Sequence, residues 1–230
     1  MSKNINVEEM AGAGVNLGHR ASKLHPKMKP YVSGVKNGVH TIDLEKTKKD
    51  LEKALAFIAK IISEGKVLLF VGTKPQLKTI IQHTAEECKM PYVTERWLGG
   101  TFTNFETIQK RVNYFKDLEK QKQTGGLEKY TKKERLDFDK EIAKLKVKFE
   151  GIRDMSKLPE AVFIFGIDKD ETAAREAKRK GVKILALVDT NINPDVADYV
   201  IPANDDAISS VLYVLDKVKD AIINSRNTKS

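Results

Sequence analysis

Three uninterrupted apolar runs constrain the fold of this chain more than any other feature. VLLFVG (67–72) and VFIFG (162–166) are rich in β-branched residues, end in glycine and lead into polar, helix-like stretches. This is the pattern of βαβ units. A third run, KILALVD (183–189), ends in an acid. Because the apolar residues are continuous and do not alternate, the strands are expected to be covered on both faces, which predicts an α/β fold with a parallel sheet.

Shorter apolar pieces, PYVT (91–94) and YVIP (199–202), are interpreted as additional strands. Helices are expected between the strands. Asp168 and Glu171 have the spacing of a capping box for a helix over 169–180, which should stop at Gly181. Asn204, followed by two aspartates, is expected to begin a last helix over 204–223. A metal site at these acids is the alternative, and capping is the favoured interpretation.

Residues 105–150 differ in composition from the segments on either side, with 13 Lys/Arg, nine Asp/Glu and no strand signal. Two narrow apolar stripes have helical spacing: Ile108, Val112, Phe115 and Leu118, then Phe138, Ile142, Leu145 and Phe149. A break at TGG (124–126), followed by Thr131 and Glu134 as a capping box, predicts an antiparallel helical hairpin. The stripes are too thin for a domain core, so the hairpin is expected to project as a coiled coil. An ordinary pair of packed surface helices is the alternative.

The first 45 residues show little regularity after a short helix-compatible start at 7–13. The segment 17–44 combines two prolines, three glycines and isolated bulky residues. It predicts an extended arm that becomes ordered against a partner. The expected organisation is therefore a basic arm with a short helix at 1–45, an α/β domain at 46–104 and 151–230, and the hairpin at 105–150.

The charge distribution indicates a polyanionic partner. The chain has 41 Lys/Arg against 32 Asp/Glu, a net charge of +9. Residues 18–42 contain three histidines, no acid and five cations. The five cations of the arm are Arg20, Lys23, Lys27, Lys29 and Lys36. Basic residues interleaved with rings and stiffened by prolines are suited to follow a phosphate backbone.

The strand ends do not predict catalysis. VGTKPQ (71–76) lacks the spacing of a nucleotide-binding loop, although Lys74 is expected to meet a phosphate as an isolated charge. The aspartates of FGIDKDE and LVDTNINPD have no nucleophile beside them, and turn formation explains them. The histidines and the single cysteine, Cys88, lack the spacing of a zinc site. No cofactor, metal, small-molecule substrate or membrane span is expected, and Cys88 should pack as a small buried hydrophobe in a cytoplasmic protein.

The segment RWLGGTFTNF (96–105) admits two interpretations. Arg96 offers a guanidinium for phosphate, and the glycine pair allows close backbone approach. Alternatively, Trp97 and Leu98 anchor a tight connection between strand and hairpin. We expect the aromatic residues to lie inside and Arg96 to face outward.

These blocks resemble one known family. GHRASKLHPKMKPYVSGVKNGVHTIDLEKT (18–47), LLFVGTKPQ (68–76), MPYVTERWLGGTFTNFETI (90–108) and VDTNINPDVADYVIPANDDAISS (188–210) are similar, in the same order, to the bacterial small-subunit ribosomal protein two family. The likeness covers almost the whole chain. One departure is NLGHRASKLHPK, where many members have an aromatic residue before Gly-His.

The resemblance implies a flavodoxin-like sheet with a protruding helical hairpin, in a non-enzymatic constituent of the small subunit of the cytoplasmic ribosome. Implied partners are small-subunit ribosomal RNA and neighbouring ribosomal proteins, including the large mRNA-binding ribosomal protein one where it is present. The resemblance also places RNA contact in the N-terminal block that contains the five cations of the arm. The family signature falls on Trp97, Leu98, Gly99, Gly100 and Asn104. Two other functions stay open: an enzyme that uses the crevice of the sheet, and a protein adaptor that docks through the hairpin.

Overall fold

The structure is a computed structural model that describes residues 5–227. A five-stranded parallel sheet forms the centre of the molecule. The strands are β4 (Leu68–Val71), β5 (Tyr92–Val93), β6 (Ala161–Ile164), β7 (Lys183–Val188) and β8 (Tyr199–Pro202). Their spatial order is β5-β4-β6-β7-β8, and every neighbouring pair is parallel. This is the flavodoxin-like order, in which the connection reverses between β4 and β6. The predicted parallel α/β sheet is confirmed.

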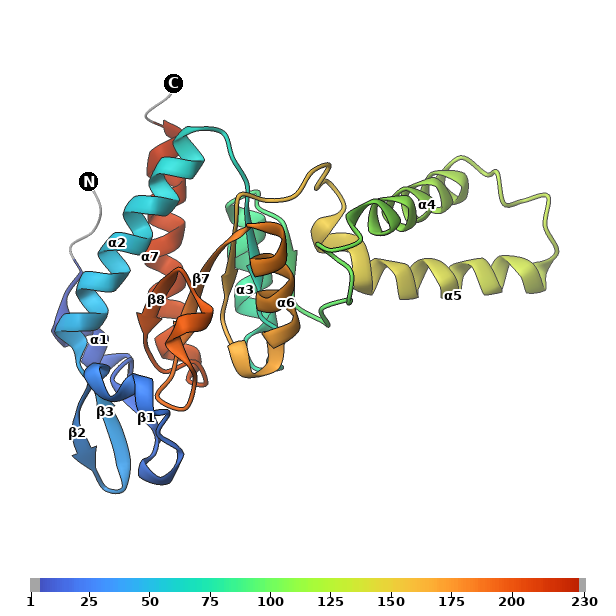
Figure 1. Ribbon diagram of the computed structural model, residues 1–230. Coiled ribbons are helices and arrows are strands. Elements are labelled where there is room, and N and C mark those ends of the chain that lie inside the picture. Colours follow the sequence, from blue (N-terminus) through green and yellow to red (C-terminus); the bar gives the residue numbers. More distant parts are fainter. Residues whose placement is uncertain (1–4, 228–230) are drawn as a thin grey trace.

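Helices cover both faces of the sheet (Figure 1). α2 (Leu44–Ser63), α3 (Lys78–Glu87) and α7 (Ile208–Asn227) share one core with alternate strand residues such as Phe70 and Phe163. α6 (Ile167–Lys180) packs on the other face, against Leu69 and Ile164 among others. Since strands β4 and β6 are buried along their whole length, their apolar runs could not alternate with polar residues.

The predicted N-terminal caps of two helices are wrong, and one predicted helix stop is confirmed. α6 ends at Gly181, which adopts the left-handed conformation at φ +71°. The helix begins after Gly166 without a capping hydrogen bond. The predicted capping box is absent, because Asp168 pairs with Lys74 at 3.3 Å and Glu171 lies 3.7 Å from Arg175. α7 begins at Ile208, because the Asn204 side chain caps the preceding turn, accepting from the backbone N–H groups of Asp206 and Ala207.

The segment 105–150 forms two helices, α4 (Phe105–Gln123) and α5 (Lys132–Phe149), that lie side by side away from α2 and α7 (Figure 1). The predicted capping box is present, since Thr131 and Glu134 exchange side-chain and backbone hydrogen bonds. Val112 and Phe115 on the predicted stripe are fully buried. A coiled-coil geometry for this pair stays a prediction.

The N-terminal segment is not the extended arm that we expected. After α1 (Val7–Gly12), strands β1 (Leu17–Arg20), β2 (Val32–Lys36) and β3 (Val39–Ile42) form an antiparallel sheet in the order β1-β3-β2. Short 3₁₀ helices at Ala21–Lys23 and Pro26–Tyr31 connect β1 to β2. The hairpin of β2 and β3 turns at Asn37 and Gly38, both at positive φ. An Asn-Gly pair is a strong local hairpin signal, so the sequence does contain evidence of this turn.

None of the helices in residues 5–227 combines the length and the apolar character that a bilayer crossing requires.

Candidate nucleic-acid interface

The five cations predicted to bind RNA lie on the N-terminal sheet and its connections, and we call them the N-terminal cationic surface: Arg20, Lys23, Lys27, Lys29 and Lys36. All five are exposed. Lys27 forms an ion pair with exposed Asp195, and no other member forms one within the described chain. The structure therefore presents four uncompensated positive charges and one partly compensated charge on a folded support.

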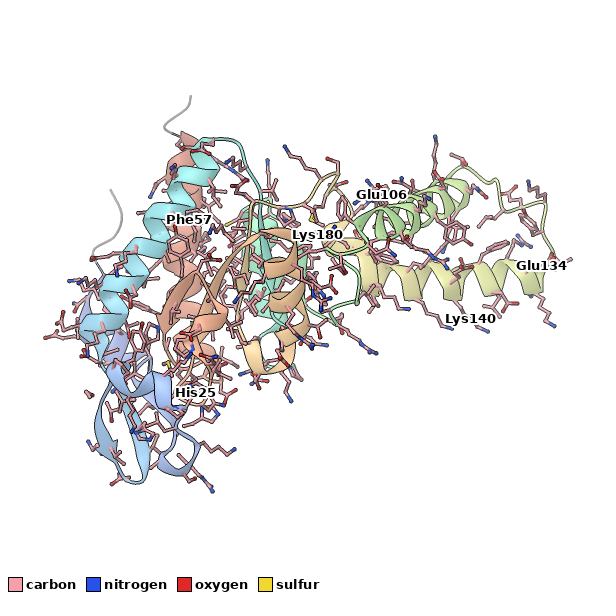
Figure 2. All side chains as sticks on the ribbon, in the orientation of Figure 1. His25, Phe57, Glu106, Glu134, Lys140 and Lys180 are labelled. Atoms are coloured by element: carbon pink, nitrogen blue, oxygen red, sulfur yellow. The ribbon has the colours of Figure 1, made fainter. Side chains whose placement is uncertain are left out.

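The 3₁₀ helix at Pro26–Tyr31 positions Lys27 and Lys29. Pro26 occupies its first turn, and the His25 ring, labelled in Figure 2, accepts a hydrogen bond from the Lys27 backbone N–H at 3.3 Å. Between the two exposed lysines, Met28 points inward and is fully buried in the core that contains Val71. One buried side chain thus orients two cations toward solvent.

Thr190, just beyond β7, fixes the N-terminal sheet on the α/β domain. Its hydroxyl accepts from the backbone N–H of His19 at 2.9 Å, and its carbonyl accepts from the backbone N–H of His25 at 2.8 Å. Gly18 lies so close that a β-carbon there would be 2.6 Å from the Thr190 methyl group. The cationic surface is therefore attached to the α/β domain by contacts within the chain.

Lys74 lies at the carboxyl ends of β4 and β6, where sheets of this topology usually bind ligands. It is 4% exposed, and its ammonium nitrogen is 2.8 Å from Asp205 Oδ1, 2.8 Å from Asp206 Oδ1 and 3.3 Å from Asp168 Oδ1. Its stem crosses Gly166, where a β-carbon would be 2.7 Å from Lys74 Cε. The expected phosphate contact is wrong, because the ammonium is enclosed by carboxylates.

Charged groups around Lys74 link the crevice at the carboxyl ends of β4 and β6 to the N-terminal sheet. Burial opposes the charged ammonium, but the nearby carboxylates outweigh it and raise the pKa of Lys74. His19 of β1 donates toward Asp189 at 2.9 Å and lies 3.7 Å from Asp206. The hydrogen bond with Asp189 raises the pKa of His19 above its ordinary value. The crevice thus holds oppositely charged side chains from five separate segments, which contain His19, Lys74, Asp168, Asp189 and the pair Asp205 and Asp206.

The aspartates at the strand ends have structural partners. Burial raises the pKa of Asp170, whose oxygens accept from the backbone N–H and hydroxyl of Thr73. Asp195 pairs with Lys27. No cluster of three or more His, Cys, Asp or Glu with the arrangement of a metal site occurs in residues 5–227. Cys88 is buried, as predicted, and burial raises the pKa of its thiol to about 11, far from that of a nucleophilic thiolate.

The WLGG segment is a structural connection between β5 and α4, centred on Glu176 of α6. Glu176 Oε1 accepts from the Gly100 backbone N–H at 2.7 Å and from Trp97 Nε1 at 3.4 Å. Oε2 accepts from the backbone N–H groups of Phe102 at 2.9 Å and Thr103 at 3.1 Å. Burial alone would raise the pKa of Glu176, but these donors outweigh it and lower the pKa.

The interpretation of this segment as an anchor is confirmed. Trp97 and Phe102 are buried in edge-to-face contact with ring centroids 4.9 Å apart, while Arg96 is exposed. Gly100 has φ +95°, which favours glycine. A β-carbon at Gly99 would meet nothing within 4 Å, so the expected close backbone approach is not found there. Asn104 stands before α4 without a capping hydrogen bond, and half-buried Leu98 accepts from the Thr101 hydroxyl at 2.6 Å.

Comparison with known proteins decides the family. The family model described as "Ribosomal protein S2" matches residues 10–225. The chain belongs to the ribosomal protein S2 family. The small ribosomal subunit protein uS2 of Chlorobaculum tepidum is 47% identical over 226 residues, covering 98% of this chain and 91% of the relative. The uS2 proteins of Roseiflexus castenholzii and Dehalococcoides mccartyi are 44% and 42% identical, covering 98% and 96% of this chain and 86% and 91% of theirs.

Membership of the S2 family confirms the resemblance seen in the sequence and makes the chain a structural, non-enzymatic protein of the small subunit of the cytoplasmic ribosome. Sequence reasoning did not identify two residues that organise this S2 chain. Glu176 sits within a charged helical stretch, KDETAAREAKRK, where nothing marks one acid as buried. His19 was treated as part of a basic arm, although its contact with Asp189 spans 170 positions and left no local signal.

Proposed function

We propose that this S2-family chain binds small-subunit ribosomal RNA through the N-terminal cationic surface, as a rigid structural element of the subunit. The observation that carries the proposal is the contrast between two groups of cations. Arg20, Lys23, Lys29 and Lys36 are exposed without carboxylate partners in the described chain, whereas Lys74 in the crevice is buried among carboxylates. Positive charge is thus available outside the crevice and neutralised within it.

RNA phosphates suit this surface because exposed Lys and Arg side chains neutralise them and release the cations that are condensed on the RNA. A fixed support limits the conformational entropy lost on binding. Arg96, exposed beside the WLGG anchor, is proposed as a further phosphate contact, as expected from the sequence. Lys74 is withdrawn from the RNA-binding set.

The helices of 105–150 are proposed to form the projecting coiled-coil hairpin and to contact neighbouring small-subunit proteins. Leu136 on α5 is 54% exposed, which leaves an apolar side chain available to a protein neighbour. The large mRNA-binding ribosomal protein one, where present, is retained from the sequence-based expectation as a further proposed neighbour.

Salt titration tests the proposed function. Binding of the full chain to in vitro transcribed small-subunit ribosomal RNA should weaken linearly in log Kd against log salt, by about 0.7–0.9 ions per phosphate contact. Arg20→Glu with Lys23→Glu should lower affinity at least tenfold and reduce co-sedimentation with small subunits, while the urea unfolding midpoint stays close to wild type. Salt-independent binding, or equal binding by this variant, contradicts the proposal.

A further inference from the structure

Two adjoining hollows lie along β5, the edge strand next to the base of the hairpin. The first has a volume of about 440 Å³, and Lys89, Lys157 and Arg226 are among the residues that line it. The second has a volume of about 290 Å³, with Arg96, Lys146 and Lys148 in its wall. Tyr92, Glu150 and Gly151 line both hollows. We call these two adjoining hollows, defined by the six cations and the shared wall, the β5 trough.

The six trough cations have no carboxylate partner within the described chain. Lys66 also lines the first hollow, but it is not counted among the six because it pairs with Glu64 and Glu160, neither of which lines the trough. All six are at least partly exposed, and they come from segments that are far apart in the sequence. The fold thus gathers separate positive charges along one depression.

The carboxylates of the trough do not neutralise these cations, because each is near a cation that does not line it. Glu95 pairs with Lys78 at 2.5 Å, and Asp154 pairs with Lys116 at 3.2 Å. Glu150 lies 3.9 Å from the Arg153 guanidinium, which pairs more closely with Glu119 at 2.6 Å, and Glu150 Oε2 is buried without a hydrogen-bond partner within the described chain. The six charges therefore stay in excess, which distinguishes this region from the neutralised crevice around Lys74.

The centre of the trough is fixed. A β-carbon on Gly151 would overlap the Tyr92 carbonyl oxygen and ring, so the 3₁₀ turn at Glu150–Ile152 packs directly on β5. The Tyr92 hydroxyl donates to Glu86 at 2.9 Å, which ties the ring to α3. The two groups of cations, one on each side of this contact, are consequently held apart by packed backbone.

We propose that the β5 trough is a second RNA-binding surface, which takes successive phosphates of a ribosomal RNA strand on the two sides of Tyr92. The inference rests on the proposed function and adds a site remote in sequence from the N-terminal cationic surface. A strand of nucleic acid carries a charge at every nucleotide and so matches two separated cation groups better than a single small anion does. Val147, 62% exposed in the wall of the second hollow, supplies an apolar contact for a ribose or base edge.

A matched pair of variants on α5 tests the trough. Lys146→Gln with Lys148→Gln removes two trough charges, and Lys132→Gln with Lys133→Gln removes two exposed charges from the first turn of the same helix. With the full chain and in vitro transcribed small-subunit ribosomal RNA, the trough variant should lose at least fivefold in affinity at 0.15 M salt. Its slope of log Kd against log salt should fall by about one to two units, while the control changes less.

The outcomes separate the trough from the proposed function. If the trough variant matches its control while Arg20→Glu with Lys23→Glu loses binding, the trough inference is overturned and the proposed function stands. If wild type shows no salt-dependent binding, the proposed function itself fails. If polyglutamate at equal charge concentration displaces the RNA as well as unlabelled RNA does, the trough is a site for acidic protein and the inference is wrong. Circular dichroism and urea unfolding of each variant confirm that it is folded.

Discussion

Glu176 Oε1 and the Gly100 backbone N–H are joined by a 2.7 Å hydrogen bond that links α6 to the WLGG connection. One carboxylate from the middle of a helix thereby satisfies backbone donors of a loop 76 positions away. Each donor would otherwise be part-buried without a partner, which costs about 1–3 kcal/mol. The conformation of the signature segment of this S2-family chain therefore depends on hydrogen bonds to Glu176 of α6. No pattern in the neighbouring sequence predicts that contact.

Replacing Glu176 should destabilise the fold without reducing positive charge. Glu176→Ala is expected to lower the free energy of unfolding by about 2–4 kcal/mol, because several N–H donors lose a charged acceptor. Glu171→Ala on the same helix, where the side chain is exposed, should cost less than about 0.5 kcal/mol. Urea unfolding followed by circular dichroism measures both. Equal stability of the two variants would show that the loop holds its own shape.

Acid should weaken the same link. The pKa of Glu176 is lowered in the folded chain, so its stabilising contribution is present above the pKa of an unfolded glutamate, about 4.3, and is lost as pH falls through the folded pKa. Between pH 6 and pH 3, wild type should therefore lose more stability than Glu176→Gln does. Parallel urea titrations at each pH provide the comparison, and identical pH profiles would contradict the assignment.

Lys74 distinguishes a structural cation from an RNA contact. Lys74→Met leaves buried Asp205 without its 2.8 Å partner, which is expected to cost about 3–5 kcal/mol of unfolding free energy. Lys78→Met breaks only a partly exposed pair with Glu95 and should cost about 1 kcal/mol or less. Thermal melts separate the two. Lost RNA affinity with unchanged stability in Lys74→Met would restore the phosphate contact that the sequence suggested.

The sequence predicted what depends on neighbours along the chain and missed what depends on distant ones. Continuous apolar runs identified β4, β6 and β7 because burial on two faces leaves a local trace. The Thr131–Glu134 capping box was found for the same reason. The environment of Lys74 could not be predicted, because its carboxylate partners Asp205 and Asp206 are 131 and 132 positions away and Asp168 is also far along the chain. The β2–β3 hairpin of the N-terminal sheet could have been predicted, since Asn37-Gly38 is a local signal for a hairpin turn.

The contact between His19 and Asp189 should make attachment of the N-terminal sheet depend on pH. Because the pKa of His19 is raised in the folded chain, its contribution is fully present below the unfolded value of about 6.5 and is lost as pH rises through the folded pKa. The groups around the imidazole are Asp189, Asp205 and Asp206, with Lys74 behind them. The stability gap between wild type and His19→Asn should therefore narrow from pH 6 to pH 8.5, as measured by urea unfolding. A constant gap would mean that the imidazole acts only by packing.

The close packing of Gly18 against Thr190 gives a test of whether the cationic surface must be rigid to bind RNA. Gly18→Ala places a methyl group 2.6 Å from the Thr190 methyl and 3.1 Å from the His40 carbonyl oxygen, so β1 must shift, at a cost of about 1–3 kcal/mol. Gly34→Ala is the control in the same sheet, since a β-carbon there meets nothing within 4 Å. Neither substitution alters charge. Limited proteolysis should cut Gly18→Ala faster within residues 17–42, and its affinity for small-subunit ribosomal RNA should fall about threefold or more, with the control near wild type. If proteolysis is faster but affinity is unchanged, the five cations act as a flexible arm, and the fixed support adds nothing to recognition.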